Sequence, residues 1–390
     1  MLVTCLSLLL ATTSCNNDEL EFNAPQASKQ YTKAELIEQA LSRMPKTRAG
    51  STPVMMISIK DTVRIRCLAS EPMEIYWEDG IDTIPKNTFT EYAHTYDKGK
   101  PSHLILISGS TDVIRSLYLN DNALIFLSIA SNKILNSLYC SDNHLSEIDI
   151  QNSPTLRAFY IENNELSSIE LSDFPVLAMF LATNNRLTEL DVSSNTQLSS
   201  LYVGKNQLTE LYLGNNTNLQ YLDASSNFIT NLDLRQNTNL SNIALSNLPI
   251  RELNKVPVDE MDFSVFPNLR QIKIANTPFQ VLDLSNNPLI TEINISGTAI
   301  PQLDVSELHD INRLYATRSK LKSLIWGQNG FEYLTEVRIE STPFENDRVL
   351  AFASQLPTRS KEYPGHFYTY SRLIDLIFSN LNPKHWLLNQ

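Results

Sequence analysis

Tyrosine recurs at a 21-residue spacing in the middle of the chain, where its chemistry would be that of a recognition surface. Tyr118, Tyr139 and Tyr160 follow one another at this interval, and Tyr202 lies two intervals further on. A tyrosine offers a large amphipathic area at a low cost in rotamer entropy, and the small residues beside these tyrosines leave room for a ligand. The candidate ligand-binding residues are Tyr118, Tyr139, Tyr160, Tyr202, Tyr221 and Tyr315. The alternative is that the tyrosines only pack across strands, each pair contributing about 0.2–1 kcal/mol.

A second recurring set of residues is acidic and occupies the outward positions of a second predicted strand. These residues are Glu147, Asp149, Glu170, Glu189, Asp191, Glu210, Asp233, Glu252, Asp283 and Asp304. Like charges stacked about 4.8 Å apart in water repel by about 1 kcal/mol per pair. Hydrogen bonds to turn amides, solvent or bound calcium would relieve this repulsion, and Asp149, Asp191 and Asp233 are the weak metal candidates. Because no loop brings several ligands to one point, we favour a solvated, hydrogen-bonded face and expect no metal and no cofactor.

The sequence lacks the usual residue patterns of catalysis. Its six histidines are dispersed, and none belongs to an H-E-x-x-H motif. There is also no glycine-rich phosphate loop, no G-x-S-x-G and no C-x-x-C. Cys140 falls at an inward repeat position and Cys67 alternates with apolar neighbours, so both are interpreted as core residues. We therefore expect no enzymatic activity.

The composition indicates an acidic, folded protein. Hydrophobic residues make up 42% of the 390 residues and charged residues 19%, which excludes a disordered chain. The formal net charge is −12, so binding to a nucleic-acid backbone, which requires basic patches, is not expected. Only 10 residues are glycine, and asparagine and serine must therefore form most turns.

The N-terminal segment is interpreted as an export signal. The apolar run from Leu2 to Ala11 is shorter than the roughly 20 residues that span a bilayer. Small residues follow it and lead to Cys15, in a pattern that resembles the cleavage box of bacterial lipoproteins. This resemblance implies that residues 1–14 are a signal peptide and that Cys15 is lipidated.

The residues after Cys15 indicate where the protein is located in the cell and how its folded part is linked to the lipidated cysteine. The acidic stretch 16–21 resembles the export signal of surface-exposed lipoproteins in some Gram-negative bacteria. It implies an outer-membrane lipoprotein, at the cell surface rather than on the periplasmic side, whereas the alternative is an ordinary secretory signal with a polar linker. Residues 15–50 then form the lipidated cysteine and its tether, with one predicted helix over 33–44 that has Leu36, Ala40 and Leu41 on one side.

Internal repeats dominate residues 111–343. Eleven units begin at Ile114, Leu135, Leu156, Leu177, Leu198, Leu219, Leu240, Leu269, Ile290, Ile311 and Leu334. Most steps are 21 residues, and an insertion at 249–268, which is either a contact loop or a tolerated bulge, lengthens one of them. The pattern L-x-x-L-x-L-x-x-N resembles the leucine-rich repeat family, and its two-part form resembles the short bacterial subclass called IRREKO repeats.

The two halves of each unit predict the shape of a coil. Both halves have the sequence pattern of short strands, so we expect a mainly β fold. Its shape should be a narrow and gently curved leucine-rich-repeat solenoid about 50 Å long. One coil cannot bury its apolar face alone, and stability must come from stacking. The ninth position carries an asparagine whose amide can bond its own turn and the adjacent coil. The members of this predicted structural ladder are Asn122, Asn143, Asn164, Asn185, Asn206 and Asn227.

Non-repeating segments are predicted to close both ends of the solenoid. Residues 51–110 read as alternating short strands, and the fragments at 77–80 and 94–96 resemble the W-x-x-G and H-T-Y signatures of PKD-like β-sandwich domains. Residues 344–390 are expected to form a helical C-terminal cap, with one helix up to Gln355 and a second over 370–381. Trp386 and Leu387 are predicted anchors onto the last coil.

Together these features predict a non-enzymatic, lipid-anchored surface protein that acts as a monomer. The tyrosine-bearing face of its repeats would mediate protein–protein interaction or adhesion with an extracellular host or microbial protein. One alternative is a glycan-binding surface protein, because tyrosines along a sheet can also stack on sugar rings. A third interpretation is a structural role in the envelope. All three tryptophans lie outside the tyrosine stripe, which favours a protein ligand.

Overall fold

The computed structural model describes residues 31–43, 54–97, 99–109, 112–130, 132–150, 152–327, 332–344, 346–360, 364–369, 381 and 384–389. The predicted signal peptide, the predicted lipidation site Cys15 and the acidic stretch after it lie outside these residues. The chain forms two compact units, the first of Met1–Leu177 with Asn184–Arg186 and the second of Ala178–Thr183 with Leu187–Gln390. Among the described helices, none is long and apolar enough to cross a membrane.

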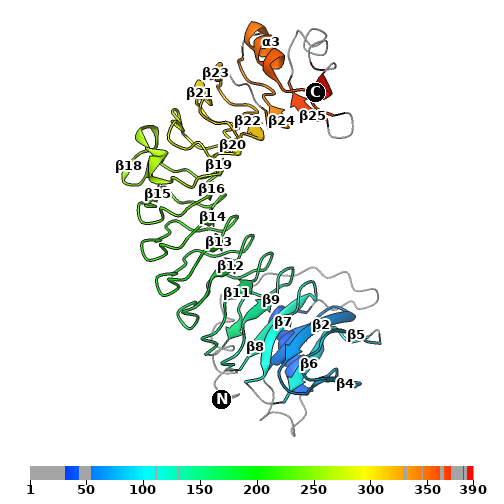
Figure 1. Ribbon diagram of the computed structural model, residues 1–390. Coiled ribbons are helices and arrows are strands. Elements are labelled where there is room, and N and C mark those ends of the chain that lie inside the picture. The colour runs from blue at the N-terminus through cyan, green and yellow to red at the C-terminus, as the bar shows by residue number, and fades with distance from the viewer. Residues whose placement is uncertain are drawn as a thin grey trace. The chain divides into compact units, whose positions relative to one another are not determined.

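Two sheets build the first unit. Its strands are β1 (Val54–Ser58), β2 (Thr62–Ala69), β3 (Met73–Tyr76), β4 (Ile81–Ile84), β5 (Phe89–Thr95), β6 (His103–Ser108), β7 (Ile114–Tyr118), β8 (Leu124–Ile129), β9 (Ser137–Tyr139), β10 (Asp149–Ile150) and β11 (Ala158–Tyr160). One sheet has the order β10-β8-β1-β6-β3-β4, and the other runs β11-β9-β7-β2-β5. In the second, β7, β9 and β11 are parallel rungs from successive coils, as Figure 1 shows.

The segment before the repeats continues both sheets of the coils. Strand β2 pairs antiparallel with β7, the first strand of the first coil, and β1 pairs antiparallel with β8. Because these pairings satisfy the backbone groups at the open end of the solenoid, the segment covers an edge that would otherwise be exposed. The β-strands expected over 51–110 are therefore built into the first coil on both of its sheets.

Helix α2 (Lys33–Ser42) packs on the N-terminal part of the first unit. It begins at a capping box in which Thr32 and Glu35 each accept from the other's backbone N–H. Its buried residues Leu36, Ile37 and Ala40 join a core cluster with residues of β1, β6 and β8. The predicted helix over 33–44 is thus present, two residues shorter, and its inward side includes Ile37 in addition to Leu36 and Ala40.

Parallel first-half strands form the main sheet of the second unit. They are β12 (Met179–Leu181), β13 (Ser200–Tyr202), β14 (Tyr221–Asp223), β16 (Asn242–Ala244), β19 (Gln271–Lys273), β20 (Glu292–Asn294), β22 (Arg313–Tyr315) and β24 (Glu336–Arg338), followed by β25 (Gly365–Tyr368) and β26 (Trp386–Asn389). Adjacent members pair in parallel and in register. The repeat leucines at the inward positions are fully buried, for example Leu198, Leu201 and Leu208 at 0% exposure. These coils form the mainly β leucine-rich-repeat solenoid that the sequence predicts.

The second halves of the coils are less regular than predicted. In the described residues, second-half strands occur only as β8 and β10 in the first two coils and as β15 (Asn231–Leu232), β17 (Glu252–Leu253), β21 (Gln302–Asp304) and β23 (Ser323–Ile325) further along. In the coil that starts at Leu177, the stretch from Glu189 to Val192 belongs to no strand or helix. A turn begins at Ser193, which leaves too few residues for a continuous ladder on that side.

The insertion at 249–268 is a folded part of its coil. Strand β17 pairs antiparallel with β18 (Val256–Pro257), and the short 3-10 helices Val258–Glu260 and Phe263–Val265 follow. Phe263 and Phe266 are buried at 1% and 0% exposure, whereas Asp259 is exposed. The insertion is therefore anchored by apolar side chains and extends the second-half sheet by one strand.

A small mixed cap follows the last repeat. Helix α3 (Asn346–Gln355) places Phe352 against Trp326, with ring centroids 5.7 Å apart. Trp386 is 2% exposed, and its Nε1 donates to the Pro357 carbonyl at 2.7 Å. Its predicted role as an anchor agrees with this burial. The same prediction is wrong for Leu387, which is 47% exposed because successive residues of β26 face opposite sides.

The predicted second helix over 370–381 lies outside the described residues, apart from Leu381.

Left-handed backbone recurs at one position of the coils, two residues after the last inward position of the first strand. It holds Asn163 at φ 53°, Lys205 at φ 54°, Ser226 at φ 57° and Arg318 at φ 56°. Glycine occupies the position only at Gly297, where a Cβ would lie 2.0 Å from Oδ1 of Asn276. Asparagine and serine hold most of these positions, as predicted, and aspartate holds two of them at Asp121 and Asp142. Lysine and arginine occur once each, although a positive φ strains their backbone.

Candidate interaction surface

Three of the predicted tyrosines form one stack on the outer face of the first unit. Tyr118 and Tyr139 lie with ring centroids 4.1 Å apart and planes 8° apart, and Tyr139 and Tyr160 are 4.4 Å and 15° apart. The strand register places them directly opposite one another on β7, β9 and β11. Phe89 of β5 meets Tyr118 edge-on at 5.1 Å and is 51% exposed. We call Tyr118, Tyr139 and Tyr160 the tyrosine stack.

Stacking determines which part of each ring a ligand can reach. Neighbouring rings cover both faces of Tyr139, so only its edge and hydroxyl point away from the sheet. Burial, together with a hydrogen bond to Tyr139, raises the pKa of the Tyr118 hydroxyl. The stack therefore offers a ridge of neutral phenol groups beside the small side chains of Ser116, Ser137 and Ala158.

Charged residues border the tyrosine stack at both ends. On one side Arg66, which is paired in register with Tyr118, makes an ion pair of 2.8 Å with Glu91. On the other side Glu162 lies two residues after Tyr160, and its carboxylate receives no hydrogen bond or ion pair from any described residue. Burial and the nearby charge of Asp142 raise the pKa of the Glu162 carboxyl. This end of the stack thus carries negative charge that nothing described neutralises.

The other three predicted tyrosines belong to the second unit and do not form a stack. Tyr202 on β13 lies in register between Leu181 and Asp223, whereas Tyr221 on β14 is 38% exposed. The hydroxyl of Tyr315 on β22 donates to Glu336 at 2.9 Å. Burial raises the pKa of Tyr315, and the hydrogen bond to Glu336 acts in the same direction.

A charged region on the outer face of the last coils was missed by the sequence analysis. Lys273 and Glu292 lie 2.9 Å apart, and Glu292 and Arg313 lie 3.4 Å apart. Arg338 pairs with Glu336 at 2.7 Å and lies over the ring of Tyr368 at 4.3 Å. The available signal was the change at the third repeat position from small residues to Glu292, Arg313 and Glu336 in successive coils, together with Lys273 and Arg338 at the fifth position.

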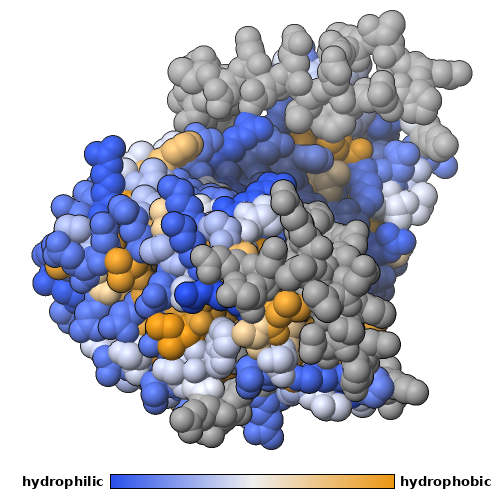
Figure 2. Space-filling model, turned by 90° about the horizontal axis from the view of Figure 1, so that it is seen from above, coloured by the Kyte–Doolittle hydropathy of each residue, from blue (hydrophilic) through white to orange (hydrophobic). Residues whose placement is uncertain are grey.

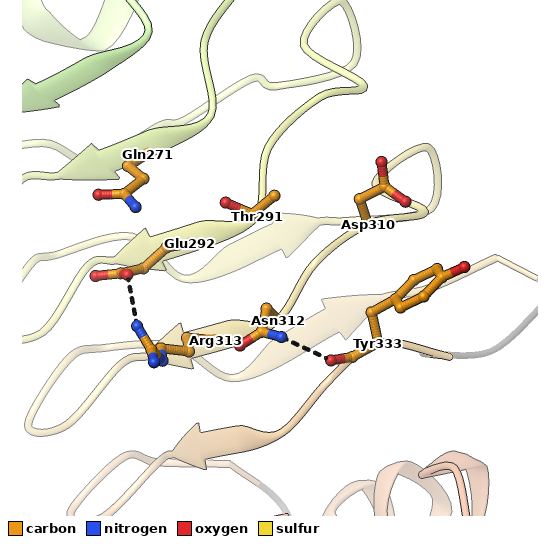
Figure 3. A pocket seen from close by; sticks show the side chains of 7 residues that line it. All are labelled: Gln271, Thr291, Glu292, Asp310, Asn312, Arg313 and Tyr333. Carbon is orange, nitrogen blue, oxygen red and sulfur yellow. Dashed lines mark hydrogen bonds and ion pairs between the residues drawn. The ribbon is translucent and has the colours of Figure 1, made fainter. Parts of the chain in front are cut away.

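A shallow depression of about 380 Å³ opens in this charged region. Figure 3 shows the residues that line it: Gln271, Thr291, Glu292, Asp310, Asn312, Arg313 and Tyr333. The figure places Gln271, Glu292 and Arg313 in one column on successive strands, and Asp310 and Tyr333 at the opposite end. We call this feature the polar depression.

Elsewhere the exposed surface is mostly polar. The face drawn in Figure 2 is largely hydrophilic, and hydrophobic residues reach it in small, separate patches. Large exposed hydrophobic residues among those described are likewise scattered through the chain, such as Ile81 at 54%, Phe228 at 60% and Val281 at 54%. Isolated residues of this kind are ordinary on a protein surface and define no apolar docking patch.

The weak metal candidates are each engaged by neighbouring groups. Asp149 accepts from Ser128 Oγ at 2.9 Å, and Asp191 accepts from the Ser193 backbone N–H at 2.8 Å. Hydrogen bonds from the Arg235 side chain lower the pKa of Asp233 to about 2. Among the residues that the structure describes, no three of His, Cys, Asp and Glu group closely enough to hold a metal ion. Hydrogen bonds to turn amides thus relieve at least part of the charge repulsion on this face.

The predicted asparagine ladder links the coils through side-chain amides. Its six members are between 1% and 8% exposed. Asn206 Oδ1 accepts from the Leu187 N–H at 3.0 Å, and its Nδ2 donates to the carbonyls of Ala182 and Val203 at 3.0 Å each. Asn122 at the start of the ladder bonds both the N–H and the carbonyl of Arg64 on β2. The ladder therefore also joins the N-terminal segment to the first coil.

A second ladder of buried asparagines was missed. It comprises Asn132, Asn195, Asn216, Asn237 and Asn287, each at most 1% exposed. Asn237 Nδ2 donates to the Leu213 and Asn216 carbonyls at 3.0 and 2.9 Å. The recurring Asn-Thr dipeptide before the next repeat start, as at 195–196 and 216–217, was the signal that could have identified it.

The structure also brings together two histidines that are dispersed in the sequence. Tyr96 stacks on His103 at 3.8 Å and meets His94 at 4.6 Å, and His94 in turn stacks on Trp77 at 5.0 Å. Burial lowers the pKa of His103, which is 1% exposed. This cluster packs the N-terminal strands together and presents no nucleophile.

Comparisons with known proteins identify similar solved structures. No protein-family model matches the chain, and no curated protein matches it in sequence. The chain is similar to the functional domain of InlJ from Listeria monocytogenes, with 19% identity over 66% of this chain and 68% of that one and a TM-score of 0.45. It is also similar to YopM from Yersinia enterocolitica WA-314, with 20% identity over 66% and 64% of the two chains and a TM-score of 0.41.

A third similar structure is a leucine-rich-repeat protein of Leptospira interrogans, with 15% identity, 66% and 90% coverage and a TM-score of 0.37. The chain thus spans slightly less than two thirds of the YopM chain and most of the Leptospira chain. At identities this low, the comparisons assign no ligand and no activity to this protein.

Proposed function

We propose that the protein is a non-enzymatic binding protein that recognises an extracellular protein through the tyrosine stack. The observation that carries this proposal is the register of Tyr118, Tyr139 and Tyr160, whose edges and hydroxyls form one continuous ridge. Tyrosine edges combine apolar contact with hydrogen bonding, a combination that is enriched where proteins bind proteins. The bordering small residues leave the sides of the ridge accessible to a partner's side chains.

The charges beside the tyrosine stack favour a basic segment of the partner. Glu162 and Asp142 lie together at one end, and no described cation neutralises Glu162. An arginine or lysine of the partner would form a charge-assisted hydrogen bond with Glu162 and would lower the pKa of its carboxyl. The affinity of such a contact falls with rising ionic strength.

The glycan alternative fits the tyrosine stack less well. A sugar ring stacks on the face of an aromatic ring, but the faces of Tyr139 are occupied by its neighbours at 4.1 and 4.4 Å. The purely structural role would require only cross-strand packing, for which the same stacking is sufficient. Binding measurements are therefore needed to distinguish a protein-binding role of the tyrosine stack from a purely structural one.

The location proposed for this function is the cell surface. A lipid on Cys15 would anchor the chain in the outer membrane, as the sequence around that residue suggests. The segment between Cys15 and α2 would then be the tether, because α2 itself packs on the first unit through Leu36 and Ala40. A PKD-like ancestry of residues 51–110 is part of the same proposal and rests on the sequence signatures. A Cys15→Ala chain that still fractionates with outer membranes would contradict the lipid anchor.

The binding proposal is tested with variants of the tyrosine stack. Wild type and a Tyr139→Ala/Tyr160→Ala chain are screened by biolayer interferometry against matched panels of purified extracellular proteins and glycans. We expect a protein hit whose affinity falls at least about 10-fold in the variant, equivalent to about 1.4 kcal/mol. Tyr212→Ala is the matched control, because Tyr212 is 72% exposed and lies outside the stack. If the folded double variant keeps every hit, the tyrosines only pack the sheet.

A further inference from the structure

We propose that the polar depression of the second unit binds one unit of a neutral saccharide. This inference is independent of the tyrosine stack, which belongs to the other unit and is proposed to bind protein. It rests on the groups that line the depression, on their charge and on the accessible ring of Tyr333.

The floor of the depression is held in place by its own interactions. Glu292 is only 7% exposed, and it lies between Lys273 at 2.9 Å and Arg313 at 3.4 Å. Asn312 donates through Nδ2 to the Tyr333 carbonyl at 3.1 Å (Figure 3). Its Oδ1 accepts from the Thr335 hydroxyl at 2.8 Å. Because these groups are already paired, ligand binding requires little reorganisation of the floor.

Several groups at the rim have hydrogen-bonding capacity left. Among the described residues, none donates to the carboxylate of Asp310 or bonds the side-chain amide of Gln271. The ring of Tyr333 is accessible, since this residue is 50% exposed. A carboxylate and an amide can together receive and donate the hydrogen bonds of vicinal hydroxyls, and the electron-rich face of a tyrosine ring attracts polarised C–H groups. A saccharide presents both kinds of group.

Charge and polarity exclude the other common classes of small ligand. Glu292 is already paired with both Lys273 and Arg313, so the charge in the lining that lacks a described partner is the carboxylate of Asp310, which repels phosphate, sulfate and acidic sugars. An apolar ligand would find mainly carboxylate, amide, hydroxyl and guanidinium groups. The volume of about 380 Å³ lies within the range of small-molecule sites, and only the polar lining differs from the usual one.

The test uses the full chain and defined sugars. Glucose, galactose, mannose, N-acetylglucosamine and the disaccharides cellobiose and lactose are compared with sialic acid and galactose 6-sulfate by saturation-transfer NMR and titration calorimetry. We expect millimolar or tighter binding of at least one neutral sugar, at least 10-fold weaker in Tyr333→Ala and in Asp310→Asn. Tyr212→Ala and Asp259→Asn, two exposed residues outside the depression, are the matched controls and should bind as wild type.

Two results would overturn the proposal. One is the absence of binding by every neutral sugar at 20 mM, and the other is binding that persists unchanged in both Tyr333→Ala and Asp310→Asn. A preference for the anionic sugars would contradict the charge argument and equally overturn it. The protein partner of the tyrosine stack should bind Tyr333→Ala normally, so failure of one proposal is distinguishable from failure of the other. Thermal unfolding of each variant verifies that it is folded.

Discussion

Asn143 accepts a hydrogen bond at its Oδ1 atom from the backbone N–H of Leu124, 3.0 Å away in the preceding coil. Its Nδ2 donates to the carbonyls of Leu119 and Cys140 at 3.0 and 2.9 Å. One side chain therefore satisfies backbone groups of two coils that would otherwise be buried without partners. In the later coils Thr298 replaces the asparagine, and its hydroxyl donates only to the Ile295 carbonyl of its own turn.

Replacement of a ladder asparagine should therefore destabilise the protein more than replacement of its threonine counterpart. Asn206→Ala removes the partners of the Leu187 N–H and of the Ala182 carbonyl, and we expect a loss of about 2–4 kcal/mol in the free energy of unfolding. Thr298→Ala removes one hydrogen bond, and we expect about 1 kcal/mol. Urea unfolding followed by circular dichroism measures both. Equal losses would contradict a role of the asparagine between coils.

Replacing a left-handed residue other than asparagine by glycine should stabilise the protein. Arg318 is exposed and has φ 56°, a conformation that costs an ordinary side chain about 1 kcal/mol. We expect Arg318→Gly to raise the unfolding free energy by about 0.5–1 kcal/mol. Lys320→Gly is the control, because Lys320 is exposed but has no positive φ, and it should be neutral or destabilising. A lower melting temperature for Arg318→Gly would show that its side chain contributes more than the strain costs.

The stability that α2 gains by packing on the repeats should depend on pH, because the Glu165 carboxylate contributes to it only when it is ionised. Burial by itself would raise the pKa of this carboxyl, but a hydrogen bond from His144 and the charges of Lys33 and Arg186 outweigh burial and lower it. Because the folded-state pKa is below the unfolded one, the contribution of Glu165 is fully present above the unfolded value of about 4.3 and is lost as the pH falls through the folded value. Lys33 is the first residue of α2, so this contribution connects the helix to the repeats.

We expect Glu165→Gln to lower the unfolding free energy by about 1–2 kcal/mol at pH 7. The difference from wild type should shrink as the pH is lowered from 5 to 2.5. Urea titrations at several pH values measure it, and Glu38→Gln, on an exposed position of α2, is the control. A difference that stays constant down to pH 2.5 would exclude an ionised Glu165 as its cause.

The two cysteines of the described region should be unreactive in the native protein. Burial raises the pKa of the Cys67 thiol to about 12 and also raises that of Cys140, and both are free and 0% exposed. In a chain with Cys5→Ser and Cys15→Ser, a disulfide reagent at pH 8 should detect no thiol before unfolding and two after it. Ser167→Cys, at an exposed position, is a positive control that should react at once. Rapid reaction of the native protein would place at least one cysteine at the surface.

The sequence by itself determined the coil register and the inward residues. The 21-residue period places the same apolar positions of every unit on one side, and burial of that side is possible only if the units stack. Leu198 and Leu208 are accordingly buried completely. The same periodicity identified the asparagine ladder, since an amide at a fixed position of every coil meets the same backbone groups each time. It also indicated helix α2 from the side shared by Leu36 and Ala40.

Only the tertiary structure decided how residues of different coils and segments meet. Whether two tyrosines stack depends on side-chain rotamers and on the distance between strands, which the repeat pattern does not specify. The pairing of β2 with β7 and of β1 with β8 joins segments that share no repeat. The polar depression joins residues of successive coils: Arg313 pairs in register with Glu336, which gives Tyr333 the same position in its coil as Asp310 and brings both residues into one lining. Local sequence sets what each coil buries, whereas long-range packing sets which exposed groups come close enough to act together.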